Sequence, residues 1–259
     1  MTDAFFAELT RALGAAVLTG DAVDDKYRSD MSMTGSARPR AIIRPRSTEE
    51  VSAALRICNS HRVNAVPQGG LTGLAGGANP DADCVVISLE LMRGIEEIDE
   101  ASATMTVKAG TPLEVAQQAA ADAGLFLGLD LGSRGSCQIG GNLATNAGGI
   151  RVIRYGMARE QVLGLEAVLA DGTVISSMNK MLKNNAGYDL KHLFIGSEGT
   201  LGIITRAVLR LHPPPGEITT ALCALSSYED VVKLLRAAQS AIGNVAAFEA
   251  MWSDYHVFT

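Results

Sequence analysis

Glycine gathers in three clusters of this sequence, and small polar side chains lie among the glycines. The clusters run from 69 to 77, from 132 to 149 and from 196 to 202. Glycine leaves peptide N–H groups uncovered, and successive N–H groups in a loop can form a concave phosphate site without Lys or Arg. Hydroxyl and amide groups suit phosphate and ribose. The clusters carry them at Thr72, Ser136, Asn142, Thr145 and Asn146. The pattern favours a nucleotide site built largely from backbone.

The two commonest nucleotide motifs do not occur in the sequence. The phosphate-binding loop of NTPases needs a Gly-Lys-Ser/Thr run, and the chain has no Gly-Lys pair. The dinucleotide fingerprint needs G-x-G-x-x-G, and no two glycines here are separated by a single residue. For any one glycine the alternative is a tight turn with no ligand, which the residues alone leave open.

Histidine and cysteine offer little further chemistry. We expect no metal site, because the histidines are scattered and lack metal-ligand spacing. The four cysteines are far apart and include no C-x-x-C pair, which argues against a disulfide framework and favours a reducing compartment. These residues are His61, His192, His212 and His256, and Cys58, Cys84, Cys137 and Cys223.

A β-α-β unit leads into the first cluster. Ala41 to Ile43 have the pattern of a strand, and Ser47 with Glu50 forms a capping box for a helix. Apolar residues then recur at helical spacing through Cys58, and Val63 to Val66 turn extended.

Further elements follow each cluster. Thr111, Pro112 and Glu114 predict the N-cap and first turn of a helix that stops at Gly124. Asp171-Gly172 predicts a two-residue hairpin turn between two strands within 162–177. Three more strands are predicted, within 83–90, 103–110 and 202–213. The fold class is therefore α+β.

The triple proline at 213–215 is the clearest boundary, because consecutive prolines donate no ladder hydrogen bonds and stiffen the chain. We predict one domain over 1–213 and the beginning of a second over 214–259, with a strand, an amphipathic helix and another strand. One such unit cannot cover both faces of its sheet, so a truncated second domain with exposed apolar surface is expected.

Bulk composition restricts the class of partner. The chain has 259 residues, 47% of them hydrophobic, and a formal net charge of −6. This balance argues against nucleic acid and anionic membrane surfaces, which need clustered Lys and Arg. The start lacks the pattern of a signal peptide, and no apolar run reaches the roughly 18 residues of a membrane span. We expect a cytoplasmic protein with no integral membrane segment.

Four long segments resemble a known family. "PQGGLTGLAGGANP", "LDLGSRGSCQIGGNLATNAGGIRVIRYG", "VLGLEAVLADGT" and "NNAGYDLKHLFIGSEGTLGIITRAVLRLHPPP" are similar, in this order, to signatures of FAD-linked oxidoreductases of the vanillyl-alcohol oxidase type. The resemblance runs from Pro39 to the end of the chain. It implies a PCMH-type FAD-binding domain of two α+β subdomains with FAD between them, followed by the start of a ferredoxin-like substrate domain.

The resemblance also implies the residues that hold FAD. It places the first cluster around the pyrophosphate, the second along the ribityl chain and the isoalloxazine, and Ile203 near the adenine. Leu71 stands where some relatives carry a histidine bonded to the flavin, so noncovalent FAD is expected. The implied cofactor residues are Pro67, Gln68, Gly69, Gly70, Leu71, Thr72, Gly73, Gly135, Ser136, Gly140, Gly141, Asn142, Thr145, Asn146, Gly148, Gly149 and Ile203.

The implied function is an FAD-dependent dehydrogenase that oxidises a D-2-hydroxy acid, with D-2-hydroxyglutarate favoured. D-lactate or glycolate dehydrogenase or oxidase, and a noncatalytic FAD carrier completed by another chain, are the alternatives. The expected partners are a small carboxylate, an electron acceptor and a second copy in a homodimer. No catalytic residue is assigned, since the family's substrate and metal residues are expected beyond Thr259, and this polypeptide alone is expected to be inactive. Arg151, Arg154 and Arg159 are candidates for carboxylate binding, with surface salt bridges as the alternative.

Overall fold

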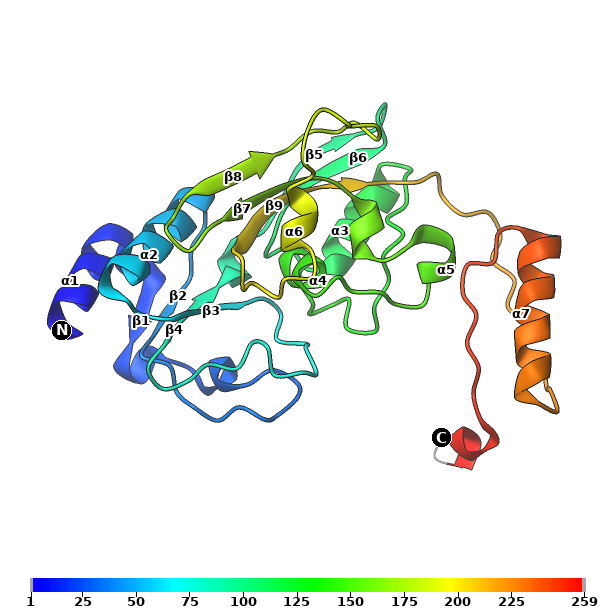
Figure 1. Ribbon diagram of the computed structural model, residues 1–259, viewed down its shortest axis with the longest axis horizontal. Helices are drawn as coiled ribbons and strands as arrows, with labels where there is room; N and C mark the ends of the chain where they lie inside the picture. The colour runs from blue at the N-terminus through cyan, green and yellow to red at the C-terminus, as the bar shows by residue number, and fades with distance from the viewer. Residues whose placement is uncertain (1, 258–259) are drawn as a thin grey trace.

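The computed structural model describes residues 2–257, which form two β-sheets with helices packed on and between them (Figure 1). The first sheet has the order β1-β2-β4-β3, and β4 pairs in parallel with both β2 and β3. The second has the order β5-β6-β9-β7-β8 and is antiparallel throughout. The strands are β1 Val17–Thr19, β2 Ala41–Ile43, β3 Ala65–Gln68, β4 Val85–Ser88, β5 Ile95–Asp99, β6 Thr104–Lys108, β7 Val162–Val168, β8 Val174–Ser177 and β9 Ile203–Arg210. The predicted α+β class is confirmed.

The helices range from one turn to four. The α-helices are α1 Thr2–Leu13, α2 Thr48–His61, α3 Leu113–Asp122, α4 Ile139–Ala144, α5 Val152–Tyr155, α6 Lys191–Phe194 and α7 Tyr228–Ile242. Short 3-10 segments occur at Gly14–Ala16, Gly20–Ala22, Asp25–Arg28, Leu89–Leu91, Ala158–Gln161 and Ser253–Val257. No helix among the described residues combines the length and the apolar content that crossing a bilayer requires.

Helix α2 begins at the predicted N-cap, Ser47, but only half of the predicted capping box forms. The Ser47 hydroxyl accepts a hydrogen bond from the Glu50 N–H at 3.3 Å, while the Glu50 carboxylate accepts from the N–H of Arg46, not of Ser47. Val51 and Cys58 lie on the buried face of the helix. The β2-α2-β3 unit therefore forms as predicted and delivers the chain to the first glycine cluster.

Two local predictions were wrong. The hairpin between β7 and β8 has three loop residues rather than two, because Leu169 N–H bonds to the Thr173 carbonyl and Gly172 N–H bonds to the Leu169 carbonyl. Gly172 has φ +85°, so the loop is a turn followed by a left-handed glycine, which is the usual three-residue hairpin. Thr111 does not cap α3: its hydroxyl bonds to the backbone of Gly94, and Pro112 occupies the N-cap.

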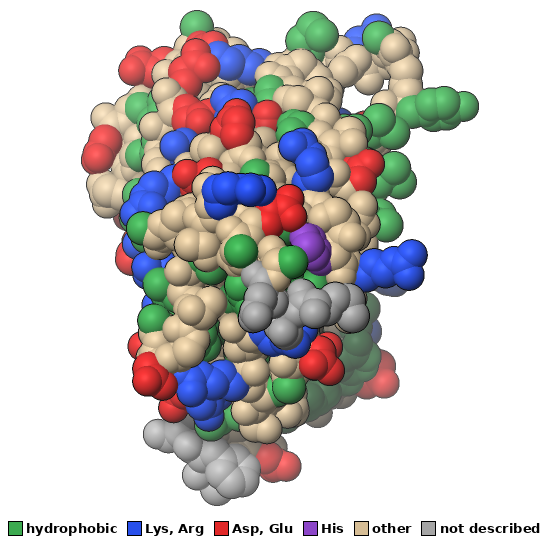
Figure 2. All heavy atoms as spheres, turned by 90° about the vertical axis from the view of Figure 1, so that its left-hand side faces the viewer, with side chains coloured by type: hydrophobic (Ala, Val, Ile, Leu, Met, Phe, Trp, Pro, Cys, Tyr) green, Lys and Arg blue, Asp and Glu red, His purple; other side chains and the backbone are tan. Residues whose placement is uncertain are grey.

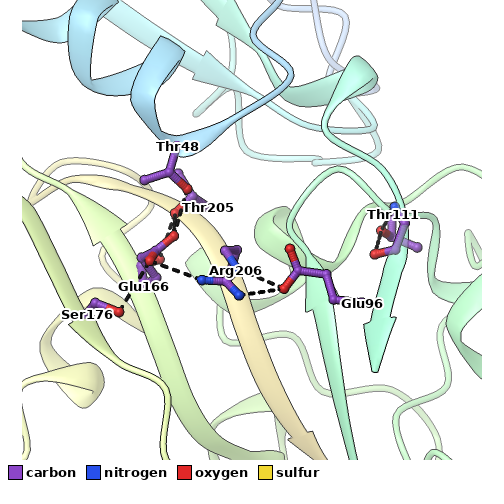
Figure 3. A network of polar contacts seen from close by, with 8 residues as sticks. Thr48, Glu96, Thr111, Glu166, Ser176, Thr205 and Arg206 are labelled. Carbon is purple, nitrogen blue, oxygen red and sulfur yellow. Dashed lines mark hydrogen bonds and ion pairs between the residues drawn. The ribbon is translucent and has the colours of Figure 1, made fainter. Parts of the chain in front are cut away.

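One hydrophobic core joins the two sheets, and a buried polar network joins helix α2 to the second sheet. Helix α2, which covers the first sheet, also contacts β7 and β9 of the second. Figure 3 shows Glu166 of β7 at the centre of the network. Its carboxylate accepts hydrogen bonds from Thr48 at 2.7 Å and Thr205 at 3.0 Å, and pairs with Arg206 at 3.3 Å. The N-terminus of α2 is thereby tied to the second sheet.

The segment after Leu211 contributes no buried residue to this body in the described part of the chain. Helix α7 forms as predicted, with Ser227 as its N-cap, but neither flanking segment is a strand. The predicted β-α-β unit is therefore wrong, because a strand needs a neighbouring strand and neither segment pairs with one. Trp252 is 63% exposed beside Tyr228 rather than in a core. In Figure 1, α7 stands apart from both sheets.

Candidate functional site

The first and second glycine clusters pack directly against each other. We call the segments 67–80, 132–149 and 196–202 the first, second and third glycine loops. A Cβ on Gly70 would overlap the carbonyl of Ser136 and lie 2.9 Å from the Cα of Cys137. A Cβ on Gly69 would lie 3.8 Å from the Cα of Gly141. Glycine at 70 thus allows two backbones to touch, and this contact brings the first two loops together.

The third glycine loop lies beside both of the others. Gly196 N–H donates to the Leu143 carbonyl at 3.1 Å, and Glu198 N–H donates to the Ala144 carbonyl at 2.9 Å. Gly199 sits so close to Pro67 that a Cβ would overlap the proline ring. All three loops therefore meet around α4, although more than 100 residues separate the first from the third.

Each glycine loop contains a residue other than glycine with a positive φ. The angles are +58° at Leu71, +48° at Asn146 and +52° at Glu198. Side chains with a Cβ seldom adopt this region, and such conformations cluster at ligand sites. The backbone is therefore held in an unusual shape at the place where the three loops converge.

The first loop also presents backbone donors. In the part of the chain that the structure describes, no protein atom accepts a hydrogen bond from the peptide N–H of Leu71, Thr72 or Gly73. These residues are partly or fully exposed, so the donors can reach a ligand. A Cβ on Gly141 would meet nothing within 4 Å, so this position borders open space rather than protein. A cradle of this kind suits a phosphate-containing ligand.

Three buried amide side chains beside the cradle each have a buried polar atom without a partner among the described residues. Gln68, Gln138 and Asn142 are 1%, 4% and 4% exposed. The Gln68 Nε2 atom donates to the carbonyls of Tyr27 and Ala78, but its Oε1 has no partner, and neither do Gln138 Oε1 and Asn142 Nδ2. An unsatisfied buried polar atom costs about 1–3 kcal/mol, so ligand-binding sites are among the places where one persists. These residues fit a polar cofactor such as FAD.

Several predicted cofactor residues have roles within the protein. The Thr145 hydroxyl donates to the Gly141 carbonyl at 3.0 Å, and Asn146 Oδ1 accepts from the N–H of Arg159 at 3.0 Å. Gly149 has φ +96° and lies against the backbone of Asp130. The remaining predicted positions also lie in or beside the second loop: Gly135 near Glu114, exposed Ser136, Gly140 against Ala109 and Gly148 near Val152.

Ile203 lies at the first position of β9 and pairs with Val168, with its side chain buried in the core. The structure therefore brings all three glycine loops together, and Ile203 follows the third loop directly.

The three arginines that are candidates for carboxylate binding differ in whether their guanidinium groups already have partners in the protein. Arg151 pairs with Asp130 at 3.1 Å, and Arg159 donates to the carbonyls of His192 and Ile195. Arg151 thus forms a salt bridge, as the alternative expects, whereas Arg159 is held by backbone carbonyls and forms no salt bridge among the described residues. Arg154 instead lines a hollow of about 390 Å³ with Arg210, where burial and both arginines lower the pKa of His212. Among the described residues no group of three or more His, Cys, Asp and Glu side chains could hold a metal.

One face of the molecule carries charges of both signs (Figure 2). On the face seen in Figure 2, Lys and Arg side chains are interspersed with Asp and Glu. This is the ordinary pattern of a solvated surface. On this face the positive side chains therefore alternate with negative ones and do not gather in one patch (Figure 2).

Sequence reasoning missed Gln138. Its position between buried Cys137 and buried Ile139 was the available signal, because a polar residue flanked by core residues in a glycine loop requires a partner.

Comparison with known proteins identifies the family of this chain. Residues 39–177 match the family model of the FAD binding domain. A Bos taurus protein named D-2-hydroxyglutarate dehydrogenase, mitochondrial, is 41% identical over 246 residues, which are 95% of this chain and 45% of that protein. A D-2-hydroxyglutarate dehydrogenase of Xanthomonas citri pv. viticola is 43% identical over 250 residues, or 96% of this chain and 53% of that protein. The chain thus spans about half the length of the curated relatives it matches.

Solved structures show the same fold. An alkyldihydroxyacetonephosphate synthase superimposes with a TM-score of 0.74 at 25% identity, covering 84% of this chain and 41% of that one. A variant of Phl p 4, described as a glucose oxidase, gives a TM-score of 0.69 at 20% identity over 82% of this chain and 44% of that one. The family model covers more than half of the sequence, and its match includes the first two glycine loops. The chain belongs to the FAD binding domain family.

Proposed function

We propose that this chain is the FAD-binding part of a dehydrogenase that oxidises a D-2-hydroxy acid, with D-2-hydroxyglutarate favoured, to the 2-oxo acid. The observation that carries the proposal is the convergence of three glycine loops on buried amides with unpaired atoms. The names of the curated relatives support the choice of substrate. Bound FAD supplies the two-electron acceptor for this oxidation.

The chain's own residues would bind and orient the cofactor. The free N–H groups of Leu71, Thr72 and Gly73 are suited to the pyrophosphate, and Asn142 Nδ2 offers a buried donor to an acceptor atom of the cofactor. Donors held by the fold need no rearrangement when the ligand arrives, which lowers the entropic cost of binding. Gly141, where a Cβ would meet nothing within 4 Å, leaves the backbone beside this cradle accessible to a ligand.

FAD is proposed to bind without a covalent bond, because Leu71 has no group that could attach to the flavin. We also propose the division into a domain over 1–213 and a second unit over 214–259. It is supported by the lack of buried residues after Leu211 in the described chain. A cytoplasmic location is suggested by four free cysteines, three of them buried. An electron acceptor and a homodimer complete the proposal.

D-lactate is the second candidate substrate. A Schizosaccharomyces pombe protein provisionally named a mitochondrial D-lactate dehydrogenase is 40% identical over 228 residues, 88% of this chain and 43% of that protein. A screen tests both. A longer protein that carries this chain, loaded with FAD, is mixed without oxygen with D-2-hydroxyglutarate, D-lactate or glycolate. Loss of flavin absorbance with D-2-hydroxyglutarate fastest is expected. Bound FAD that no 2-hydroxy acid reduces would instead support a noncatalytic carrier.

A further inference from the structure

The backbone of Gln138 is held by hydrogen bonds, whereas its side chain makes none among the described residues. Its carbonyl accepts from Asn142 N–H at 2.9 Å, the next N–H, of Ile139, donates to the Thr111 carbonyl at 2.9 Å, and the residue bridges to Pro112. It is the N-cap residue of α4, yet its side chain makes no cap hydrogen bond. Neither end of the amide is therefore used to hold the fold in the described part of the chain.

The unpaired side-chain amide of Gln138 lies where the first two glycine loops meet. A Cβ on Gly69 would lie 3.5 Å from Gln138 Oε1 and 3.8 Å from the Cα of Gly141. The Oε1 atom of Gln68, which is 1% exposed, also lacks a partner. Gln68 is the residue immediately before Gly69 in the chain, and its amide is held by the carbonyls of Tyr27 and Ala78.

Two unpaired acceptors restrict the kind of group that can complete them. A carbonyl oxygen needs a hydrogen-bond donor, and an ionised pyrophosphate has none. The hydroxyl groups of the sugar-alcohol chain and the N–H groups of the rings are the donors that FAD carries. In the orientation that the structure gives, the Gln138 carbonyl can accept from a hydroxyl or N–H group of the cofactor, and the Gln138→Glu variant below distinguishes this contact from one with the pyrophosphate.

We propose that Gln138 is a cofactor-contact residue whose side-chain carbonyl accepts a hydrogen bond from a hydroxyl or N–H group of bound FAD. The inference rests on the proposed function and deepens it, because the family resemblance assigns no role to Gln138. The residue would help to orient the cofactor along the line between the first and second loops.

The first test is Gln138→Met, which preserves length and volume but removes the acceptor. The binding constant for FAD is measured by flavin fluorescence, and thermal unfolding is followed without FAD. We expect FAD affinity to fall about fivefold to tenfold, the usual effect of one neutral hydrogen bond. Because the wild-type amide is unsatisfied without ligand, the cofactor-free variant should be as stable as the wild type or more so.

Gln161→Met is the matched control. Gln161 is 2% exposed and its Oε1 atom also lacks a partner, but it lies in the 3-10 segment Ala158–Gln161, outside the glycine loops. The same chemical change there should leave FAD affinity within twofold of wild type.

Gln138→Glu decides the nature of the contacted group. The carboxylate keeps an acceptor and adds negative charge, so the variant should bind FAD more tightly than Gln138→Met if a hydroxyl or N–H group faces it. Weaker binding than Gln138→Met would mean that the pyrophosphate faces residue 138, which would overturn the inference.

The inference also fails if wild type binds FAD and Gln138→Met binds it within twofold as well. A wild-type chain that binds no FAD would instead contradict the proposed function, so the two failures are distinguishable.

Discussion

Glycines that look alike in the sequence face different surroundings in the structure. Gly70 is required by the protein itself, since a Cβ would overlap the Ser136 carbonyl. Gly141 borders open space within the helix α4. Backbone of the second loop occupies the space that a side chain at residue 70 would need, so glycine there permits the packing of the two loops. Gly141 is the position at which a substitution reports on the ligand.

This difference predicts opposite effects for two alanine variants. Gly70→Ala should lower the free energy of unfolding by about 1–3 kcal/mol, because backbone atoms cannot move aside cheaply. Gly141→Ala should keep or raise stability, by up to about 1 kcal/mol, since alanine favours a helix, while it weakens FAD binding by intruding on the cradle. Urea unfolding without FAD and a fluorescence titration with FAD measure the two effects. Equal FAD affinity in Gly141→Ala and wild type would remove Gly141 from the site.

The cysteines are expected to differ in their reactivity toward alkylating reagents. Burial raises the pKa of the Cys58 thiol to about 12 and that of Cys84 to about 11, whereas Cys223 is exposed. Iodoacetamide at pH 8 should therefore label Cys223 and spare Cys58 and Cys84, because the thiolate is the reactive form. Mass spectrometry of the labelled peptides is the measurement. Rapid labelling of Cys58 in folded protein would contradict the burial.

The same shifts have a consequence for stability. An unfolded thiol ionises near pH 8.5, so the stabilisation from keeping both thiols neutral is complete below that pH. It is lost as the pH rises through the folded values of about 11 and 12.

Among the elements, the contact between helix α2 and the second sheet depends on Glu166. Its buried carboxylate accepts hydrogen bonds from the hydroxyl groups of Thr48, Thr205 and Ser176 and pairs with Arg206 (Figure 3). Glu166→Gln should cost about 1–3 kcal/mol of unfolding free energy, because an amide cannot accept from all of these groups. Glu96→Gln is the control: Glu96 pairs with the same Arg206 but is more exposed, so its loss should cost under about 1 kcal/mol. Similar losses in both variants, measured by urea unfolding, would refute a special role for Glu166.

Elements with strong local signals could be predicted from the sequence, and those that depend on a distant partner could not. The Ser47 cap and the apolar spacing of α2 are local, so that helix was predicted correctly. The pairing of β6 with β9 brings together residues about 100 positions apart in the sequence. No local pattern encodes such a pairing, so the order of the strands could not be predicted. The segments on either side of α7 have strand-like composition, but without a pairing strand they stay irregular.

The candidate site divides in the same way. The glycine loops and their small polar residues could be recognised from composition and motif. Their convergence around α4, the close approach of Gly70 to Ser136, and the unpaired amide of Gln138 depend on tertiary packing. Thr111 shows how packing overrides a local signal, since its hydroxyl binds Gly94 instead of capping α3.

For the whole molecule, the segment after the triple proline is predicted to separate from the body on proteolysis. Leu222 is 84% exposed and Ile218 is 69% exposed, and α7 buries none of its residues. Limited proteolysis should therefore cut first within 216–227, where exposed backbone is accessible, and leave a body that unfolds at the same temperature as the whole chain. Intact mass and thermal unfolding of the product are the measurements. A product that no longer folds would show that the tail supports the body.

The central claim is that this polypeptide holds FAD in the cradle formed by its three glycine loops, without a covalent bond. Titration of the purified chain with FAD, followed by acid precipitation, tests it most directly. We predict saturable binding at one FAD per chain and a gain of about 2.7 kcal/mol in stability at a hundredfold excess over the dissociation constant. The yellow colour should pass entirely into the supernatant on precipitation. Absence of saturable binding would contradict the site, and flavin that stays with the precipitated protein would contradict noncovalent attachment.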